Sequence, residues 1–145
     1  MFKHILLPTD GSELAGKAIE GGLTLAQSLG ARITGLVAIE PFNASALVPE
    51  QIDYNQEVYG SQARANAHRI LDAIAARAAA LGLAFDGAVI EAPQPHDAII
   101  EVASRAGCDL IVMASHGRRG MAAMVLGSVT QKVLTLSTTP VLVYR

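Results

Sequence analysis

The strongest constraint on the fold is a regular alternation of short apolar runs with longer amphipathic stretches. Five runs rich in Ile, Val and Leu have the length and composition of strands that are covered on both faces. They are His4 to Leu7, Arg32 to Ile39, Phe85 to Ile90, Leu110 to Ala114 and Val141 to Tyr144. Strands joined by helices must run parallel, and such crossovers are right-handed. The alternation therefore predicts an α/β fold of the Rossmann-like kind, with one doubly wound, five-stranded parallel sheet.

Four stretches between these runs have the three- and four-residue apolar spacing of amphipathic helices. The clearest is Glu13 to Leu29, with Ser12 placed to cap its start and Gly30 to end it. The second is clear only from Ala63, because Glu40 to Gly60 has few periodic apolar positions. We interpret that segment as a mobile connection that leads into the helix. The other two helices are expected from about His96 to Ala106 and from Ser128 to about Leu136.

The predicted sheet places one crevice at the carboxyl ends of its strands. We predict the strand order 3-2-1-4-5 with helices on both faces, so that the first and fourth strands are central neighbours. In sheets of this kind a ligand binds beyond the carboxyl ends, where the strand order reverses. The turn at Thr9 and Asp10 and the loop from Ala114 to Gly117 then face the same crevice.

Length and composition exclude several classes of protein. At 145 residues the chain has the length of one ordinary domain, and we expect residues 1–145 to form it. The net charge of −2, without a run of Lys or Arg, argues against nucleic acid and membrane surfaces as partners. A single cysteine, Cys108, excludes an internal disulfide framework. No stretch approaches the roughly 20 apolar residues of a membrane span, so we expect a cytoplasmic protein.

The stretch from Asp109 to Thr130 has the order strand, glycine-bearing loop and helix start. Gly117 lies in the loop, and Gly127 precedes Ser128, from which Ser-Val-Thr-Gln has the pattern of a capping box. A helix capped by Ser128 is therefore expected to start there. Since the first N–H groups of a helix lack partners and its dipole favours negative charge, we predict that phosphates bind here.

Four polar residues near this crevice have both an ordinary and a functional interpretation. Asp10 is a common turn residue, but its place at a strand's carboxyl end, opposite the glycine loop, favours a ligand role. His116 has no acid–base or metal partner at any motif spacing, so we interpret it as a polar loop residue that can hydrogen-bond a phosphate. Arg118 and Arg119 either neutralise phosphate charge or are solvated loop cations, and the sequence leaves both open.

Four segments together resemble the universal stress protein family, and the order of strands and helices fits this family over the whole chain. The segments are Pro8 to Ser12, Met113 to Gly117, Gly127 to Thr130 and Pro140 to Val143. The nucleotide-binding branch of the family has the pattern Gly, two residues, Gly, nine residues, then Gly with Ser or Thr. Here Gly117, Gly127 and Ser128 match the later part of the pattern, whereas Ala114 replaces the first glycine.

The resemblance implies a site for ATP, with Mg²⁺ held through the bound nucleotide. It implies that Asp10 reaches the ribose or this metal. Thr9 and Ala38 would line the adenine pocket, and Met113 would continue its wall with Ala114. The full set of implied nucleotide contacts is Pro8, Thr9, Asp10, Ala38, Met113, Ala114, Ser115, His116, Gly117, Gly127, Ser128, Val129 and Thr130.

The glycines of the pattern would serve the phosphates. The resemblance implies that Gly117 admits the phosphate chain and that Gly127 to Thr130 hold the terminal phosphates. A Cβ at Ala114 would interfere if the backbone there had positive φ or approached a phosphate closely. It would be tolerated if the residue merely ends a strand, and we favour tolerance.

We therefore expect a small cytoplasmic ATP-binding protein that acts as a nucleotide-sensitive homodimeric switch in the stress response. The resemblance implies a dimer through the last strand, Val141 to Tyr144, an apolar edge without charge or proline to deter a partner. One alternative is a dimeric interaction protein on the same fold that binds no nucleotide. A second is a slow ATP-hydrolysing or nucleotidyl-transfer enzyme. Because no candidate base other than Asp10 is found, no catalytic residue is assigned and negligible turnover is expected.

Overall fold

The computed structural model describes residues 1–43, 49–118, 120 and 126–145, with side chains for all of these except 49–54. The strands are β1 (His4–Pro8), β2 (Arg32–Ile39), β3 (Phe85–Glu91), β4 (Leu110–Ala114) and β5 (Val141–Tyr144). The helices are α1 (Glu13–Leu29), α2 (Pro49–Ala80), α3 (Pro95–Ala106) and α4 (Ser128–Leu136). None of these described helices combines the length and the apolarity that crossing a membrane requires.

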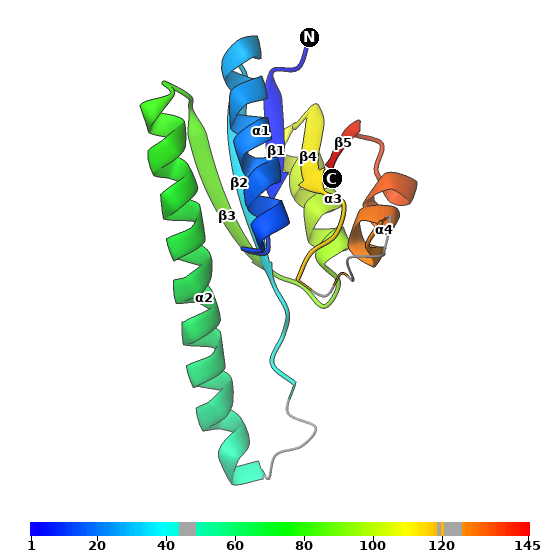
Figure 1. The fold of residues 1–145 in the computed structure, drawn as a ribbon. Coiled ribbons are helices and arrows are strands. Elements are labelled where there is room, and N and C mark those ends of the chain that lie inside the picture. The colour runs from blue at the N-terminus through cyan, green and yellow to red at the C-terminus, as the bar shows by residue number, and fades with distance from the viewer. Residues whose placement is uncertain (44–48, 119, 121–125) are drawn as a thin grey trace.

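The strands form one parallel sheet in the order β3-β2-β1-β4-β5. This confirms the predicted fold class and strand order. At the centre β1 pairs with β4, with Ile5 opposite Leu110 and Leu6 opposite Ile111. Figure 1 shows α1 and α2 over one face of the sheet and α3 and α4 over the other. The first and fourth strands consequently end side by side.

Alternate residues of the central strands are buried on opposite faces of the sheet. Ile5 of β1 packs in one apolar cluster with Leu23 of α1 and Ile74 of α2. Leu6, the next residue, packs in a second cluster with Ile99 of α3. Because both faces of β1 are covered by helices, its sequence after His4 is an unbroken apolar run and not an alternating one.

The ends of α1 follow the signals in the sequence. Ser12 is the N-cap, and its hydroxyl accepts a hydrogen bond from the Ala15 N–H at 3.3 Å. Gly30 ends the helix in the left-handed conformation, with φ 63°, which glycine adopts without steric cost. The predicted bounds of α1, β2, β4 and β5 are the observed ones.

The predicted start of α2 is wrong. The helix begins at Pro49 and not near Ala63, so residues 49–60 of the expected connection are helical, and residues 44–48 lie outside the described residues. Proline is favoured in the first turn of a helix. The first buried side chain along the described part of α2 is Ala67, since the N-terminal half of the helix projects beyond the sheet (Figure 1). A projecting half buries no apolar stripe, and the sequence there has none.

Substitution by alanine at two glycines of α1 is expected to have opposite effects on the free energy of unfolding. Gly16 is exposed, and a Cβ there would meet nothing within 4 Å. Gly22 is buried, and a Cβ there would clash with Cδ2 of the buried Leu7 side chain. We expect Gly16→Ala to raise the free energy of unfolding by about 0.5 to 1 kcal/mol, the helix preference for Ala over Gly. We expect Gly22→Ala to lower it, because overpacking a filled core costs about 1 to 3 kcal/mol.

Urea unfolding followed by circular dichroism measures both glycine variants against the parent chain. Gln27→Ala, at an exposed position of the same helix, is the control for an alanine substitution without glycine or core contact. Equal effects of Gly16→Ala and Gly22→Ala would contradict the packing of α1 on β1 described above.

Candidate functional site

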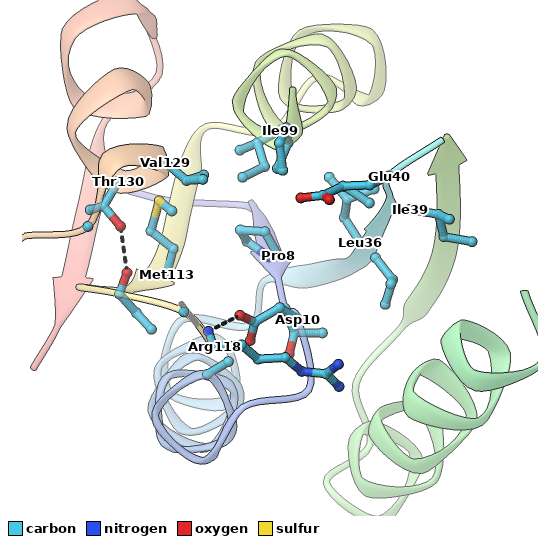
Figure 2. Close-up of a pocket in the computed structure, with 18 of the residues that line it drawn as sticks. Pro8, Asp10, Leu36, Ile39, Glu40, Ile99, Met113, Arg118, Val129 and Thr130 are labelled. Carbon is cyan, nitrogen blue, oxygen red and sulfur yellow. Dashed lines mark hydrogen bonds between the residues drawn. The ribbon is translucent and has the colours of Figure 1, made fainter. Parts of the chain in front are cut away.

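A cavity of about 650 Å³ opens beyond the carboxyl ends of β1, β2 and β4. Its volume lies in the range of binding sites for small molecules. Figure 2 shows its walls, with Pro8 and Asp10 at the end of β1, Met113 in β4, and Val129 and Thr130 at the start of α4. The cavity therefore lies at the crevice that the strand order predicted.

All but one of the site residues expected from the sequence line this cavity. They are Pro8, Thr9, Asp10, Ala38, Met113, Ala114, His116, Gly117, Gly127, Ser128, Val129 and Thr130. The exception is Ser115, which is buried with its Oγ 3.1 Å from Nδ1 of His116. The Ser115 N–H donates to the Tyr144 carbonyl oxygen at 2.7 Å, and the Ser115 carbonyl oxygen accepts from the Gly127 N–H at 2.7 Å. Ser115 thus holds the start of the loop after β4 by hydrogen bonds to β5 and to Gly127, and does not line the cavity.

Asp10 connects the two loops that the sequence placed in one crevice. Its Oδ1 accepts a hydrogen bond from the Ser12 N–H at 2.9 Å, within the turn after β1. Its Oδ2 accepts one from the Arg118 N–H at 2.7 Å, in the loop after β4 (Figure 2). Of the two arginines in that loop, Arg118 lines the cavity, whereas Arg119 lies outside the described residues.

The Asp10 carboxyl group is negatively charged at neutral pH. Burial alone would raise its pKa, because burial removes water from the charged form. Hydrogen bonds from Ser12 and from the Arg118 N–H, with the charge of the Arg118 guanidinium, outweigh burial and lower the pKa of Asp10 below its ordinary value. A group whose pKa is lowered by folding stabilises the fold above its unfolded pKa, and this contribution is lost as the pH falls through the folded pKa. The carboxylate therefore contributes to stability at neutral pH.

Gly117 makes room for this carboxylate. A Cβ at position 117 would clash with Oδ2 of Asp10. The glycine is not required by its backbone conformation, because its φ is not among the positive values found for described glycines. Glycine is needed at position 117 because the Asp10 carboxylate approaches the loop closely there.

The start of α4 corrects one detail of the sequence interpretation. The helix begins at Ser128 as predicted, but its N-cap is Gly127. Gly127 is extended (φ −75°, ψ 160°), with its N–H bonded to the Ser115 carbonyl oxygen. Its own carbonyl oxygen accepts the first helical hydrogen bond, from the Gln131 N–H at 3.0 Å. The capping-box interpretation of Ser128 is therefore wrong, and the first-turn N–H groups of α4 receive no side-chain cap from Gly127.

Ala114 ends β4 without backbone strain. No described residue other than glycine has a positive φ. The Ala114 methyl group packs with Ala15 and Ala18 of α1. Its carbonyl oxygen accepts a hydrogen bond at 2.9 Å from the hydroxyl of Thr130, whose side chain is buried and ties α4 to β4. The backbone thus accommodates the residue that replaces the first glycine of the family pattern.

Apart from Ala38, the sequence analysis named none of the wall residues contributed by β2, α2 and α3. The additional lining residues are Ala15, Leu36, Val37, Ile39, Glu40, Tyr59, Ala63, Asn66, Ile70, Pro93, Gln94, Pro95, Ile99, Arg118 and Gly120. The neighbours of Ala38 at 36, 37, 39 and 40 could have been found, since β2 lies beside β1 in the predicted order. Tyr59 could not, because its helix was expected to start later. The Tyr59 hydroxyl donates to the Glu40 carbonyl oxygen at 2.9 Å and so joins α2 to the chain after β2.

Known proteins resemble the chain over its full length. The model of the Universal stress protein family matches residues 1–145. A curated relative from Thermus aquaticus, the universal stress protein in QAH/OAS sulfhydrylase 3′ region, is 35% identical over 146 residues, covering 100% of both chains.

Solved structures share the fold. The structure of hypothetical protein MJ0577 from Methanocaldococcus jannaschii superposes with a TM-score of 0.82 at 27% identity, covering 99% of this chain and 96% of that one. A universal stress protein solved in complex with cAMP has a TM-score of 0.70 at 23% identity, covering 99% and 97%, and its likeness shows the common fold. With the family model matching from the first residue to the last, the chain belongs to the universal stress protein family.

Proposed function

We propose that the chain, as one domain spanning residues 1–145, binds an adenine nucleotide, foremost ATP, in the cavity beyond β1 and β4. In this proposal the protein is a nucleotide-sensitive homodimeric switch in the stress response of the cytoplasm. The proposal rests on one observation: the Asp10 carboxylate and the first turn of α4 line the same cavity. A carboxylate suits a sugar hydroxyl, and a helix N-terminus suits a phosphate.

The phosphates are assigned to the loop after β4 and the start of α4. The first-turn N–H groups of α4 and its dipole favour a negative group at this end of the cavity. Gly127 allows the chain to pass close to His116, since a Cβ at position 127 would lie 3.1 Å from Cα of His116. The half-buried His116 lines the cavity, and its ring can donate to a phosphate oxygen.

The base and the ribose are assigned to the opposite part of the cavity. Pro8, Leu36 and Ile39 supply apolar surface on the side of the cavity away from Val129 and Thr130 (Figure 2). The Asp10 carboxylate uses two of its roughly four acceptor positions for N–H groups, which leaves acceptors for ribose hydroxyls. A universal stress protein of the same fold was solved with cAMP, so this fold can hold an adenine nucleotide.

These contacts are sufficient for binding of ordinary strength. A charge-assisted hydrogen bond contributes about 1.5 to 3 kcal/mol, and a helix N-terminus adds about 0.3 to 1 kcal/mol. Three such bonds and the burial of the base must offset an association cost of at least ~4 kcal/mol. We therefore expect a micromolar Kd, which corresponds to about −8 kcal/mol.

The homodimer is assigned to the free edge of β5. This strand pairs with β4 on one side and ends the sheet. Two of its residues, Leu142 and Tyr144, are 37% and 36% exposed, and the Tyr144 ring lies against Gly21 of α1. An apolar edge strand without an interior charge or proline can pair with the same strand of a second copy. The alternative function, a dimeric interaction protein without nucleotide, differs from the proposal in ligand binding alone.

Titration calorimetry with ATP tests the proposal. We expect the parent chain to bind with a micromolar Kd. We expect Gly117→Ala to weaken binding about tenfold or more, because its Cβ would displace the Asp10 carboxylate by which the ribose is held. Gly16→Ala, at an exposed position of α1 that does not line the cavity and where a Cβ meets nothing within 4 Å, is the matched control and should bind as the parent does. No heat of binding from the parent chain at hundreds of micromolar ATP would contradict the nucleotide proposal and favour the interaction protein.

Ala114→Gly restores the first glycine of the family pattern. Because Ala114 has no backbone strain and its methyl group packs on Ala15 and Ala18, we expect the ATP Kd to stay within about threefold of the parent value. The variant should instead lose about 0.5 to 1 kcal/mol of unfolding free energy, as glycine does inside a strand. Parallel calorimetry and urea unfolding measure both quantities. A tenfold gain in affinity would show that the methyl group obstructs the ligand.

ATP hydrolysis is expected to be negligible. Hydrolysis needs an oriented water and stabilisation of the transition-state charge. The carboxylate best placed to orient water, Asp10, is held by two N–H groups and assigned to the ribose. A phosphate-release assay should therefore give the same low rate for the parent chain and for Gly117→Ala. Release from the parent alone would favour the ATP-hydrolysing alternative.

A further inference from the structure

Arg118 occupies the space beside Asp10 in the cavity. Its backbone N–H donates to Oδ2 of Asp10 at 2.7 Å. Its Nη2 lies 3.1 Å from the position that a Cβ on Gly11 would take, a position also 3.0 Å from Cδ1 of Ile70 in α2. Figure 2 shows the guanidinium extending from the loop past Asp10 toward α2. The side chain thus places a positive charge between the turn after β1 and the helix opposite.

The charges around this part of the cavity are few. Among the described residues that line it, the acidic ones are Asp10 and Glu40, and the basic ones are Arg118 and His116. Arg118 is the only Lys or Arg in that set. The charge of Arg118 also favours the ionised form of Asp10 and contributes to the lowering of its pKa. The Arg118 charge therefore favours the Asp10 carboxylate at the cavity wall.

Asp10 is poorly suited to hold a divalent cation in this arrangement. Mg²⁺ requires close oxygen ligands in octahedral geometry. Each oxygen of Asp10 accepts one N–H hydrogen bond, and the acceptor positions that remain suit a neutral ribose hydroxyl. An incoming cation would in addition meet the like charge of the Arg118 guanidinium, which already acts on this carboxylate. Within the described part of the chain, no three His, Cys, Asp or Glu side chains lie together as a metal-binding group. The donor set therefore does not fit the Mg²⁺ that the family resemblance implied at Asp10.

We propose that Arg118 supplies the positive charge that a divalent cation would otherwise bring to the phosphates, so that the cavity takes the adenine nucleotide in its metal-free form. This inference rests on the proposed nucleotide site. A guanidinium has five N–H donors in a planar fork that matches two phosphate oxygens. The Arg118 backbone can stay bonded to Asp10 while its side chain turns to a phosphate, because only the main-chain N–H makes that bond. A metal already bound to the phosphates would compete with the guanidinium for the same oxygens.

Calorimetric titration of ATP into the full chain, once in EDTA and once in excess MgCl₂, tests this inference. The wild type should bind in EDTA at least as tightly as in magnesium. Arg118→Gln keeps the backbone N–H on Asp10 and removes the charge, so it should bind about tenfold or more weakly in EDTA and regain affinity in magnesium. Arg105→Gln removes the same charge from an exposed ion pair with Glu101 on α3, and it should match the wild type in both buffers.

The outcomes separate this inference from the proposed function. A wild-type affinity that falls about tenfold when magnesium is chelated would overturn the inference while leaving the nucleotide site in place. Equal binding of Arg118→Gln and wild type in EDTA would overturn it as well. Absence of binding by the wild type in both buffers would overturn the proposed function, and the inference with it. Because the Arg118 side chain is exposed, the variant should fold, and its melting curve shows whether it does.

Discussion

The arrangement of the site depends on the parallel pairing of β1 with β4. An aspartate fixes this pairing at each end of the two strands. At the amino end Asp109 accepts hydrogen bonds from the N–H groups of Lys3 and His4, at 2.8 and 3.0 Å. At the carboxyl end Asp10 accepts one from the N–H of Arg118, at 2.7 Å and 108 positions away in sequence. Hydrogen bonds from backbone N–H groups to carboxylates are among the stronger hydrogen bonds in proteins. With the register held at both ends, the turn after β1 and the loop after β4 share one cavity.

Most of the fold could be predicted because local signals and tertiary packing agree. Except for His4, the central strands β1 and β4 are apolar at every position, since helices cover both faces of the sheet. Ser12 and Gly30 mark the ends of α1 by side-chain and backbone chemistry that needs no distant partner. The edge strand β3 shows the limit of such signals. The sequence of β3 contains Gly87, a residue type that weakens strands, yet the strand is continuous from Phe85 to Glu91 because its pairing with β2 continues through Gly35 and Gly87.

Two features were misjudged because the local apolar and capping patterns do not decide them. The first half of α2 projects past the sheet, so it forms a helix without the apolar stripe by which amphipathic helices are found. The sequence at Ser128 has a capping pattern, but the bond from the Gly127 N–H to the Ser115 carbonyl oxygen moves the N-cap one residue earlier. That bond joins the start of α4 to the end of β4 through tertiary structure. A local sequence pattern does not contain this bond. The position of the cavity was nevertheless predicted correctly, because it follows from the strand order.

Ser115 links the candidate ligand site to the edge strand in physical terms. It is 2% exposed, its carbonyl oxygen is bonded to the Gly127 N–H, and its own N–H is bonded to the Tyr144 carbonyl oxygen in β5. The proposed phosphate contacts begin at Gly127, and the proposed dimer contact includes Tyr144. A ligand that shifts Gly127 would also shift Ser115, because the two residues share a hydrogen bond. Ser115 is surrounded by close-packed protein atoms, so its shift would be passed on to its neighbours. In the switch that we propose, Ser115 is the buried residue through which a nucleotide at Gly127 would act on the end of β5, without a large rearrangement of the sheet.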